Sequence, residues 1–315
     1  ITFIARPATV AWREYIVTMC VGGEAPEILT STAYWANEDV NKGWWLSWNP
    51  YLEMPNLYVG AGNVGSAKWH DQFAPSLDFF QNPNGNIYIL LGDDTQVGFW
   101  YNKDMFAQLG LKEPENWAEM IANAQAAEEE LSVPGFAVAG SGTNLLAQLT
   151  WTSGWLSKFF FWEQAKEWDA DQNGWPDQFE MAEAVKAGTF TARMDSQLAR
   201  LRTLKDMASH WQDGFLGCDN DCAHRLYISG QSLTENNGIW LTGQFMADTE
   251  RDFELGWHYY PKVDKETSDL IPENAPMTNL AAGYGSFMYG LTETARWRGT
   301  ADAVLGEADI ARLRD

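Results

Sequence analysis

The chain has 315 residues, 45% of them hydrophobic, which is enough to fill the cores of two domains and is not typical of a disordered chain. Its 43 acidic and 21 basic residues give a formal net charge of -22, which repels nucleic acid and anionic membranes and excludes both as partners. The sequence contains no run of about 18 apolar residues, so it predicts no membrane-spanning helix.

Short strands and helices alternate through the first part of the chain. Residues 1–4 are expected to form a strand, and residues 12–21 are expected to form a helix that ends at Gly22. Glycine and proline recur through residues 56–86, which predicts a long loop.

A strand, a short helix and a longer helix follow one another in the next part of the chain. The apolar residues 97–101 predict a buried strand, and a short helix containing Phe106 is expected to end at Gly110 in a left-handed cap. Glu119 follows Asn116 at the spacing of a capping box, which predicts the start of the second helix.

This segment resembles part of a known protein family. From Tyr101 to Glu119 the sequence reads Tyr-Asn-Lys-Asp-x-Phe-x-x-Leu-Gly-Leu-x-x-Pro-x-x-Trp-x-Glu, which resembles the signature of family 1 extracellular solute-binding proteins. Proteins of this family deliver sugars to ABC importers. The resemblance implies an α/β fold of the two-lobed, periplasmic-binding-protein-like type (type II), with a hinge and a ligand cleft between the lobes.

Later stretches resemble further landmarks of the family. The stretch that ends at Trp240 resembles one that closes in Asn-Gly-x-Trp, and residues 253–261 resemble a strand that returns through the hinge. Residues 283–285 resemble a glycine-rich segment at the cleft. The division implied by the resemblance is lobe one, residues 1–98 and 262–290; lobe two, residues 99–261 and 291–315; and hinge crossings near residues 98–102 and 257–262.

The resemblance implies a receptor outside the cytoplasm that captures a sugar or oligosaccharide between its lobes and delivers it to the membrane subunits of an ABC transporter. Such a protein is exported, either periplasmic or extracellular and membrane-anchored, and is expected to be a monomer. The first residues lack the pattern of a secretion signal, and both ends of the chain are expected to be incomplete relative to the family.

Aromatic residues are unusually abundant, with 17 Trp, 11 Tyr and 16 Phe. Flat apolar rings with a polar edge suit the C–H faces of sugars, although most of these residues are expected to lie in the core. By resemblance, Trp240 is the first candidate for a ligand-stacking platform, and Tyr284 is the second. Trp44, Trp45 and Trp257 are weaker candidates, for which a core position is an equal alternative.

Two other classes of function stay open at this point. A glycoside hydrolase or polysaccharide lyase would need two carboxyl groups about 5 to 9 Å apart, and no acidic pair stands in a recognisable catalytic motif. The four histidines, at positions 70, 210, 224 and 258, lack the spacing of a metal site or a catalytic triad. A binding protein is therefore predicted rather than an enzyme. A receptor of the same shape for a polyamine or a metal chelate is the remaining alternative.

Three cysteines are present. Cys218 and Cys222 are close enough in sequence to close a small ring, and an exported protein is in an oxidising compartment, so a disulfide between them is expected. Cys20 would remain a buried thiol on its helix. A zinc site is the poorer alternative, because two sulfurs and His224 fall short of four ligands.

An acidic loop has the spacing of a calcium-binding site. Gly174 stands at position 6, where a twelve-residue calcium loop makes its sharp turn. The ligand positions 1, 3, 5, 7, 9 and 12 are taken by Asp169, Asp171, Asn173, Trp175, Asp177 and Glu180, with Trp175 offering its backbone carbonyl. The sequence therefore predicts a structural Ca²⁺ ion in an EF-hand-like loop. Similar loops occur in the second lobe of some members of the family that the chain resembles.

Overall fold

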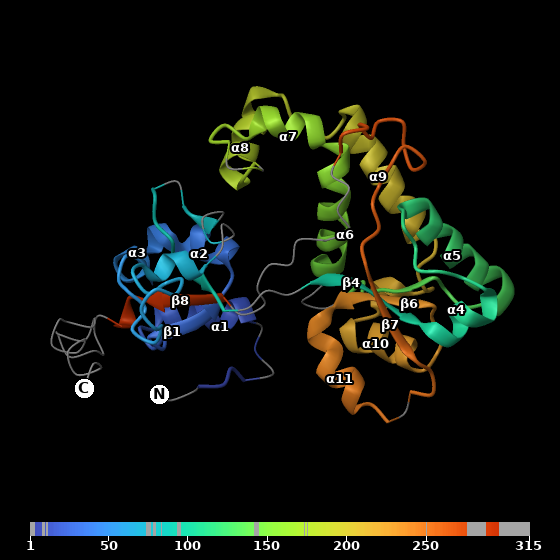
Figure 1. Cartoon of the computed structure of the whole chain (residues 1–315), viewed down its shortest axis with the longest axis horizontal. Coiled ribbons are helices and arrows are strands. Elements are labelled where there is room, and N and C mark those ends of the chain that lie inside the picture. The colour runs from blue at the N-terminus through green and yellow to red at the C-terminus, as the bar shows by residue number, and fades with distance from the viewer. Residues whose placement is uncertain are drawn as a thin grey trace. The chain divides into compact units, whose positions relative to one another are not determined.

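The computed structural model describes residues 4–7, 10, 12–73, 77, 80–82, 84–92, 96–141, 145–172, 174, 176–249, 251–275 and 288–295. The chain forms two compact units, each with its own sheet and helices (Figure 1). The first unit comprises Ile1–Asp94 and Gly285–Asp315, and the second comprises Thr95–Tyr284. In the described part of the chain, no helix is both long enough and apolar enough to cross a membrane.

The first unit contains four strands and several short helices in its described residues. The predicted helix at residues 12–21 is confirmed. The elements are α1 Trp12–Val21, β1 Ile28–Ser31, α2 Ala33–Asp39, the 3-10 helix η1 Val40–Lys42, β2 Trp45–Leu46, α3 Asn49–Leu52, the 3-10 helix η2 Trp69–Gln72, β3 Ile89–Leu91 and β8 Met288–Thr292.

Strand β8 holds the sheet of the first unit together. It pairs antiparallel with β1, β2 and β3, with Gly290 opposite both Leu29 and Ile89. Ile16 of α1 packs with Leu29 and Ile89 in the core beside this sheet. A strand from the far end of the chain therefore completes a sheet that begins near residue 28.

The second unit is larger. Its elements are β4 Val97–Asn102, α4 Lys103–Leu109, α5 Trp117–Leu131, β5 Phe136–Ala137, α6 Leu145–Phe160, α7 Trp162–Trp168, α8 Gln178–Ala187, α9 Asp195–Ala208, the 3-10 helix η4 Phe215–Gly217, α10 Asn220–Ile228, β6 Thr234–Gly238, the 3-10 helix η5 Ile239–Leu241, α11 Thr242–Ala247 and β7 Leu255–Tyr259. The strand order is β5-β6-β4-β7, with β5 and β6 parallel and the other pairs antiparallel.

The segment from β4 to α5 folds as its sequence predicts. Strand β4 is buried along its whole length, and Gly110 ends α4 in a left-handed conformation with φ of 66°. The Asn116 side chain accepts a hydrogen bond from the Glu119 backbone N–H at 2.9 Å and so caps α5. The Glu119 carboxylate in turn accepts from the backbone N–H of Glu115 rather than of Asn116, at 2.7 Å. The reciprocal bond of the capping box is thus displaced by one residue.

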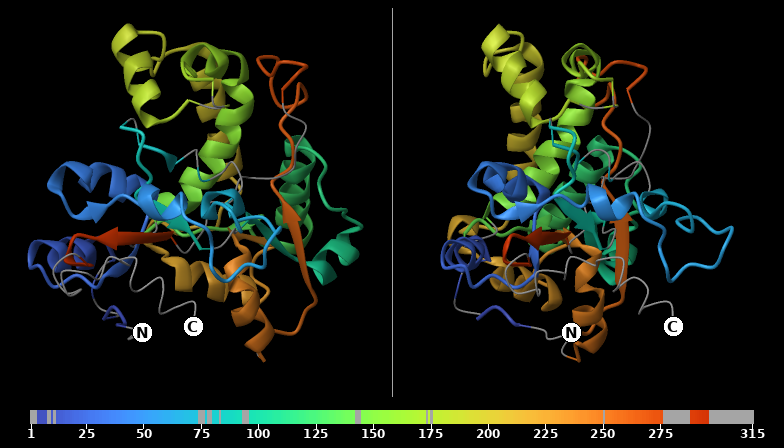
Figure 2. Two further views of the ribbon diagram at one scale, coloured as in Figure 1. Left: turned by 60° about the vertical axis from the view of Figure 1, so that its left-hand side comes forward. Right: turned by 90° about the vertical axis from the view of Figure 1, so that its left-hand side faces the viewer.

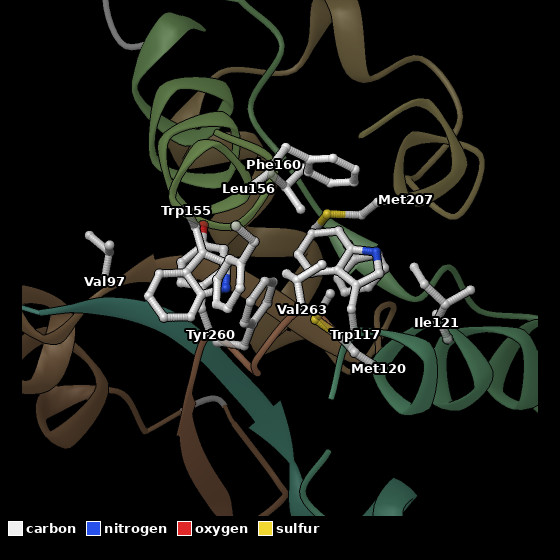
Figure 3. Packing of buried hydrophobic residues seen from close by; sticks show 14 of the residues in the cluster. Val97, Trp117, Met120, Ile121, Trp155, Leu156, Phe160, Met207, Tyr260 and Val263 are labelled. Atoms are coloured by element: carbon white, nitrogen blue, oxygen red, sulfur yellow. The ribbon is translucent and has the colours of Figure 1, made fainter. Parts of the chain in front are cut away.

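A core of large apolar side chains lies between α5, α6, α9 and the segment after β7 (Figure 3). Trp117 is central to it, and Trp155 and Leu156 of α6 and Met207 of α9 pack in the same cluster. Helices α6 and α9 lie side by side in every view (Figures 1 and 2), and a hydrogen bond from Arg200 to the Ser153 carbonyl joins them at 3.2 Å.

The expected division of the chain needs correction at its C-terminal side. Residues 262–275 were expected in lobe one, but Val263 and Ile271 are buried in the core around Trp117. The backbone N–H of Trp117 also donates to the Lys262 carbonyl at 2.9 Å. Residues 291 and 292 were expected in lobe two, but they belong to β8 and pair with β2 in the first unit. Apolar burial and strand pairing decide both placements.

Candidate functional site

Trp240 presents an indole at the surface of the second unit. It lies in η5, directly after β6, and 42% of its surface is exposed. Its ring meets that of Trp151 of α6 edge to face, with centroids 5.3 Å apart and an angle of 62° between the planes. Two indoles that meet on one surface offer the kind of aromatic platform that binds a sugar ring.

The peptide at Gly238 supports the Trp240 ring. A Cβ atom at Gly238 would overlap the ring of Trp240, so only glycine allows the indole to lie so close to the strand. The Gly238 carbonyl accepts a hydrogen bond from the Trp100 indole N–H at 3.1 Å. The Gly238 N–H donates to the side-chain oxygen of Asn237 at 2.9 Å. Both ends of this residue are therefore held.

The other predicted platform residues differ in burial. Trp45 is only 4% exposed and packs in the core of the first unit, so its proposed role as a platform is replaced by a core role. Trp44 is half-buried, with the Lys42 ammonium 4.6 Å from its ring centroid. Trp257 is half-buried on β7 against Trp100. Tyr284 lies outside the described residues.

Trp151 of α6 lies beside Trp240, although it was not among the residues predicted to bind a ligand. Trp155, four residues later on α6, is a core residue, with its indole N–H donating to the Pro261 carbonyl at 2.8 Å. Trp151 lies one turn earlier, where the helix reaches the Trp240 ring. Nothing in the local sequence separates these two tryptophans, because their difference lies in what each one meets after folding.

A row of buried polar residues precedes Trp240 on β6. Asn236 donates to the Gly98 carbonyl of β4 at 2.9 Å and to the Tyr260 hydroxyl at 2.7 Å. Thr152 of α6 lies 2.9 Å from the same hydroxyl. Burial raises the pKa of Tyr260 far above its ordinary value, so the phenol stays protonated and can serve this network as a donor. The network ties α6, β4 and β6 together.

The acidic loop brings together three of the six predicted calcium ligands. Carboxylate oxygens of Asp169, Asp171 and Glu180 lie within 4.8 Å of one another. Gly174 has φ of 119°, and the turn closes through a hydrogen bond from its N–H to the Asp169 carboxylate at 2.9 Å. Oxygen donors grouped in this way match the preference of Ca²⁺ for carboxylates.

Asp177, a fourth predicted ligand, does not join this cluster in the described part of the loop. Asp177 caps α8 instead, accepting from the backbone N–H groups of Phe179 and Glu180 at 2.8 and 2.9 Å. Glu180 completes the capping box, and its carboxylate also accepts from the backbone N–H of Ala170 at 2.7 Å. Asn173 and Trp175 lie outside the described residues. The three grouped carboxylates fit a cation, and the loop end doubles as a helix cap.

Cys218 and Cys222 are joined in a disulfide with an S–S distance of 2.04 Å. The bond closes a ring at the start of α10, where Asp219 caps the helix by accepting from the Cys222 N–H at 2.9 Å. Cys20 is a free thiol that is half-buried on α1 rather than fully buried. Burial and the nearby Asp39 carboxylate raise the pKa of the Cys20 thiol to about 11.

Alkylation should distinguish these cysteines. We expect iodoacetamide at neutral pH to leave Cys218 and Cys222 unmodified without reductant, and to modify Cys20 only slowly because little thiolate is present. Mass spectrometry of peptides, before and after reduction, measures this. Rapid labelling of both loop cysteines in the native, unreduced protein would contradict the pairing.

The sequence profile of the bacterial extracellular solute-binding protein family matches residues 8–198. The chain belongs to this family. This membership confirms the predicted family. It also makes the chain one of a group of exported binding proteins, consistent with the predicted location outside the cytoplasm.

Solved structures of solute-binding proteins share the α/β fold. RafE in complex with raffinose is 15% identical with a TM-score of 0.58, and the match covers 98% of this chain and 68% of RafE. The apo form of RafE comes from Streptococcus pneumoniae. Maltose-bound MalE3 of T. maritima is 16% identical, with a TM-score of 0.59 and coverage of 90% of this chain and 61% of MalE3. A chitin oligosaccharide binding protein is 18% identical, with a TM-score of 0.57 and coverage of 95% and 62%.

These likenesses confirm the predicted fold class. This solute-binding protein spans between 61% and 68% of the length of the three proteins named. A search among curated proteins gave no match.

Proposed function

We propose that this solute-binding protein is the sugar receptor of an ABC importer. It captures a sugar or oligosaccharide and passes it to the membrane subunits of the transporter without altering it. The family supports the role of receptor, and the similar proteins that are solved with raffinose, maltose or named for chitin oligosaccharide support the class of ligand. The observation that carries the proposal is the exposed Trp240 ring beside Trp151.

The chemistry of the platform favours a sugar over a small charged solute. An indole face gains energy from the C–H face of a pyranose ring, while the polar edge of the sugar keeps its hydroxyl groups free for hydrogen bonds. The indole pair has no carboxylate to form an ion pair with a polyamine, so a cationic solute would gain only the cation–π attraction of the rings. The protein then works by closure of its lobes around the ligand, and the closed monomer docks on the transporter.

A melting-temperature screen tests the function. Raffinose, maltose, a chitin oligosaccharide and a xylo-oligosaccharide are added separately, with spermidine as the non-sugar alternative. We expect at least one sugar to raise the melting temperature and to be recovered intact by chromatography. Cleavage of the sugar would establish the enzyme alternative instead, and stabilisation by spermidine alone would replace the sugar with a cationic solute.

The Trp240 platform makes a quantitative prediction. Replacing Trp240 with alanine should weaken binding of the sugar by about 1 to 3 kcal/mol, which is about 5- to 150-fold, while the melting temperature of the free protein changes little because 42% of the residue is already exposed to water. Isothermal titration calorimetry measures the affinity. Leu201→Ala on α9 is the control, because Leu201 has a similar exposure of 43% and lies on another helix. Equal affinity in Trp240→Ala and wild type would remove Trp240 from the site.

We infer that the acidic loop holds a structural Ca²⁺ ion. The spacing of its oxygen side chains and the grouping of Asp169, Asp171 and Glu180 support this inference. Three carboxylates so close together repel one another, and a divalent cation would offset that repulsion. The loop lies between α7 and α8, so the ion would stabilise this helical part of the second unit.

Calcium should change the melting temperature. Protein shown by elemental analysis to be free of metal should melt about 5 to 10 °C lower than protein with calcium at about 100 times its dissociation constant. Differential scanning calorimetry with chelator and with added calcium measures the difference. Asp169→Ala should abolish it, whereas Glu129→Ala, which removes an exposed carboxylate of α5, should preserve it. Identical melting curves with and without calcium would exclude the ion.

A further inference from the structure

Glu235 of β6 is a carboxylate with none of its surface exposed. Such a group must be compensated by hydrogen bonds or by a charge, because burial otherwise costs several kcal/mol. One oxygen of Glu235 lies 3.0 Å from Nδ1 of His224 on α10, and the other accepts from the Asn237 side-chain N–H at 2.8 Å. The buried carboxylate therefore joins a titratable side chain to Asn237.

Asn237 carries this connection to the surface. Its side chain donates to Glu235 and accepts from the Gly238 N–H at 2.9 Å, so a change in its orientation alters a hydrogen bond of the Gly238 peptide. The Trp240 ring lies directly on Gly238. A continuous path thus runs from His224 through Glu235, Asn237 and Gly238 to the exposed indole.

We propose that His224 and Glu235 are positioning residues for Trp240, which act through the Asn237 side chain and the Gly238 peptide. Neither residue touches the surface where a ligand would lie, since both are buried. The proton on His224 then affects the indole at the other end of the path. The consequence for ligand affinity rests on the proposed function, but the path itself is testable without a ligand.

The charges around His224 favour its protonated form. Burial opposes the imidazolium, but the hydrogen bond to Glu235 and the charges of Glu235, Asp248 and Asp221 outweigh burial and raise the pKa of His224 above its ordinary value. Asp221 lies on the same helix, and Asp248 follows α11. Tyr227 of α10 is near both Glu235 and Arg251, and burial keeps the Tyr227 phenol neutral by raising its pKa.

Loss of the His224 proton strengthens the hydrogen bond between Asn237 and Glu235. The Glu235 carboxylate then lacks a cationic partner in a buried place, so it draws more strongly on the Asn237 N–H, since hydrogen bonds to an ionised group are shorter and stronger than neutral ones. The Asn237 side chain and the Gly238 peptide then shift together, because the Gly238 N–H is hydrogen-bonded to the Asn237 side-chain oxygen. We therefore expect the surroundings of the Trp240 ring to change when His224 titrates.

Nuclear magnetic resonance of the ligand-free protein tests the path. The indole N–H resonance of Trp240 is identified by its loss in Trp240→Phe, and the ring protons of His224 by their loss in His224→Gln. In the wild type we expect the Trp240 resonance to shift with pH at the midpoint of His224. In Asn237→Ala, His224 should still titrate and the Trp240 resonance should no longer follow it, which distinguishes the path from a field acting through space.

Control and supplementary variants complete the test. His210→Gln removes a different buried histidine, which pairs with Glu128 in the same unit, and should leave the Trp240 titration unchanged. If Asn237→Ala does not fold, Glu235→Gln replaces it, and the Trp240 resonance should then not follow His224 at any midpoint. The proposal would be overturned if the Trp240 resonance does not shift with His224 in the wild type, or if it still shifts with His224 in Asn237→Ala or Glu235→Gln.

A double-mutant cycle on sugar affinity separates this inference from the proposed function. Asn237→Ala should weaken binding of the sugar found in the screen about 3- to 10-fold in the wild type and should have no further effect in Trp240→Ala, because both act on one group. Equal weakening in both backgrounds would refute a role through Trp240. If no sugar binds at all, the proposed function fails, while the ligand-free titration still decides the path.

Discussion

Replacing Trp117 with alanine should lower the free energy of unfolding of the second unit by about 3 to 5 kcal/mol. The indole is 1% exposed and packs among Met120, Met207 and Tyr260 at the centre of the core in Figure 3. Removing it leaves a large cavity that α5, α6 and α9 cannot close without losing their own contacts. The expected loss of stability has two parts: the hydrophobic free energy that burial of the ring contributes in the wild type, and the cost of the cavity left behind.

Hydrogen exchange of the α5 and β4 amides, read by mass spectrometry, measures this loss for the second unit alone. Trp117→Phe is the matched control, because it keeps most of the ring volume. Among the described residues the Trp117 indole N–H has no hydrogen-bond partner, so phenylalanine loses no such bond and should cost clearly less than alanine. A loss below about 1 kcal/mol in Trp117→Ala would show that this core is not the one that stabilises the unit.

Lowering the pH from 6.5 to 4 should destabilise the second unit through His258 by on the order of 3 kcal/mol. His258 is 6% exposed and stacks on Phe99 at 5.3 Å between the ring centroids. Burial lowers its pKa to about 4, against an ordinary value of 6.5. The unfolded chain therefore binds a proton between these pH values that the folded chain does not, and stability falls as the pH falls. Above pH 6.5 both states are neutral at this residue, and the contribution is complete.

Comparison of variants isolates this effect from that of the carboxylates, which also titrate as the pH falls. His258→Phe fills a similar space without a titratable group, so its free energy of unfolding should fall less than that of the wild type between pH 6.5 and 4. His70→Phe, at a half-buried histidine of the first unit, should leave the wild-type slope of the second unit unchanged. His224 acts in the opposite direction, because its raised pKa stabilises the fold below its ordinary pKa and that stability is lost as the pH rises through the folded value. Equal slopes in His258→Phe and wild type would refute the assignment.

Interactions between residues close in sequence were predictable. Asn116 and Glu119 are three positions apart, Gly110 directly ends its helix, and Cys218 and Cys222 are four positions apart, so each relation depends on a few backbone angles. The string from Tyr101 to Glu119 was long enough to indicate the family. The spacing of the acidic loop predicted the grouping of its carboxylates in the same way, although it did not reveal that Asp177 caps α8.

The sequence by itself thus determined the family, the fold class and the local caps, while the tertiary structure decided which distant residues meet. Strand β8 joins the first unit and residues 262–275 join the second, because each buries apolar side chains or pairs a strand edge there. Trp151 meets Trp240, and His224 meets Glu235, only after α6 and α10 pack beside β6. No local sequence pattern predicts such contacts. They are selected by the free energy of burial and hydrogen bonding between segments that lie far apart along the chain, at separations that follow no regular spacing.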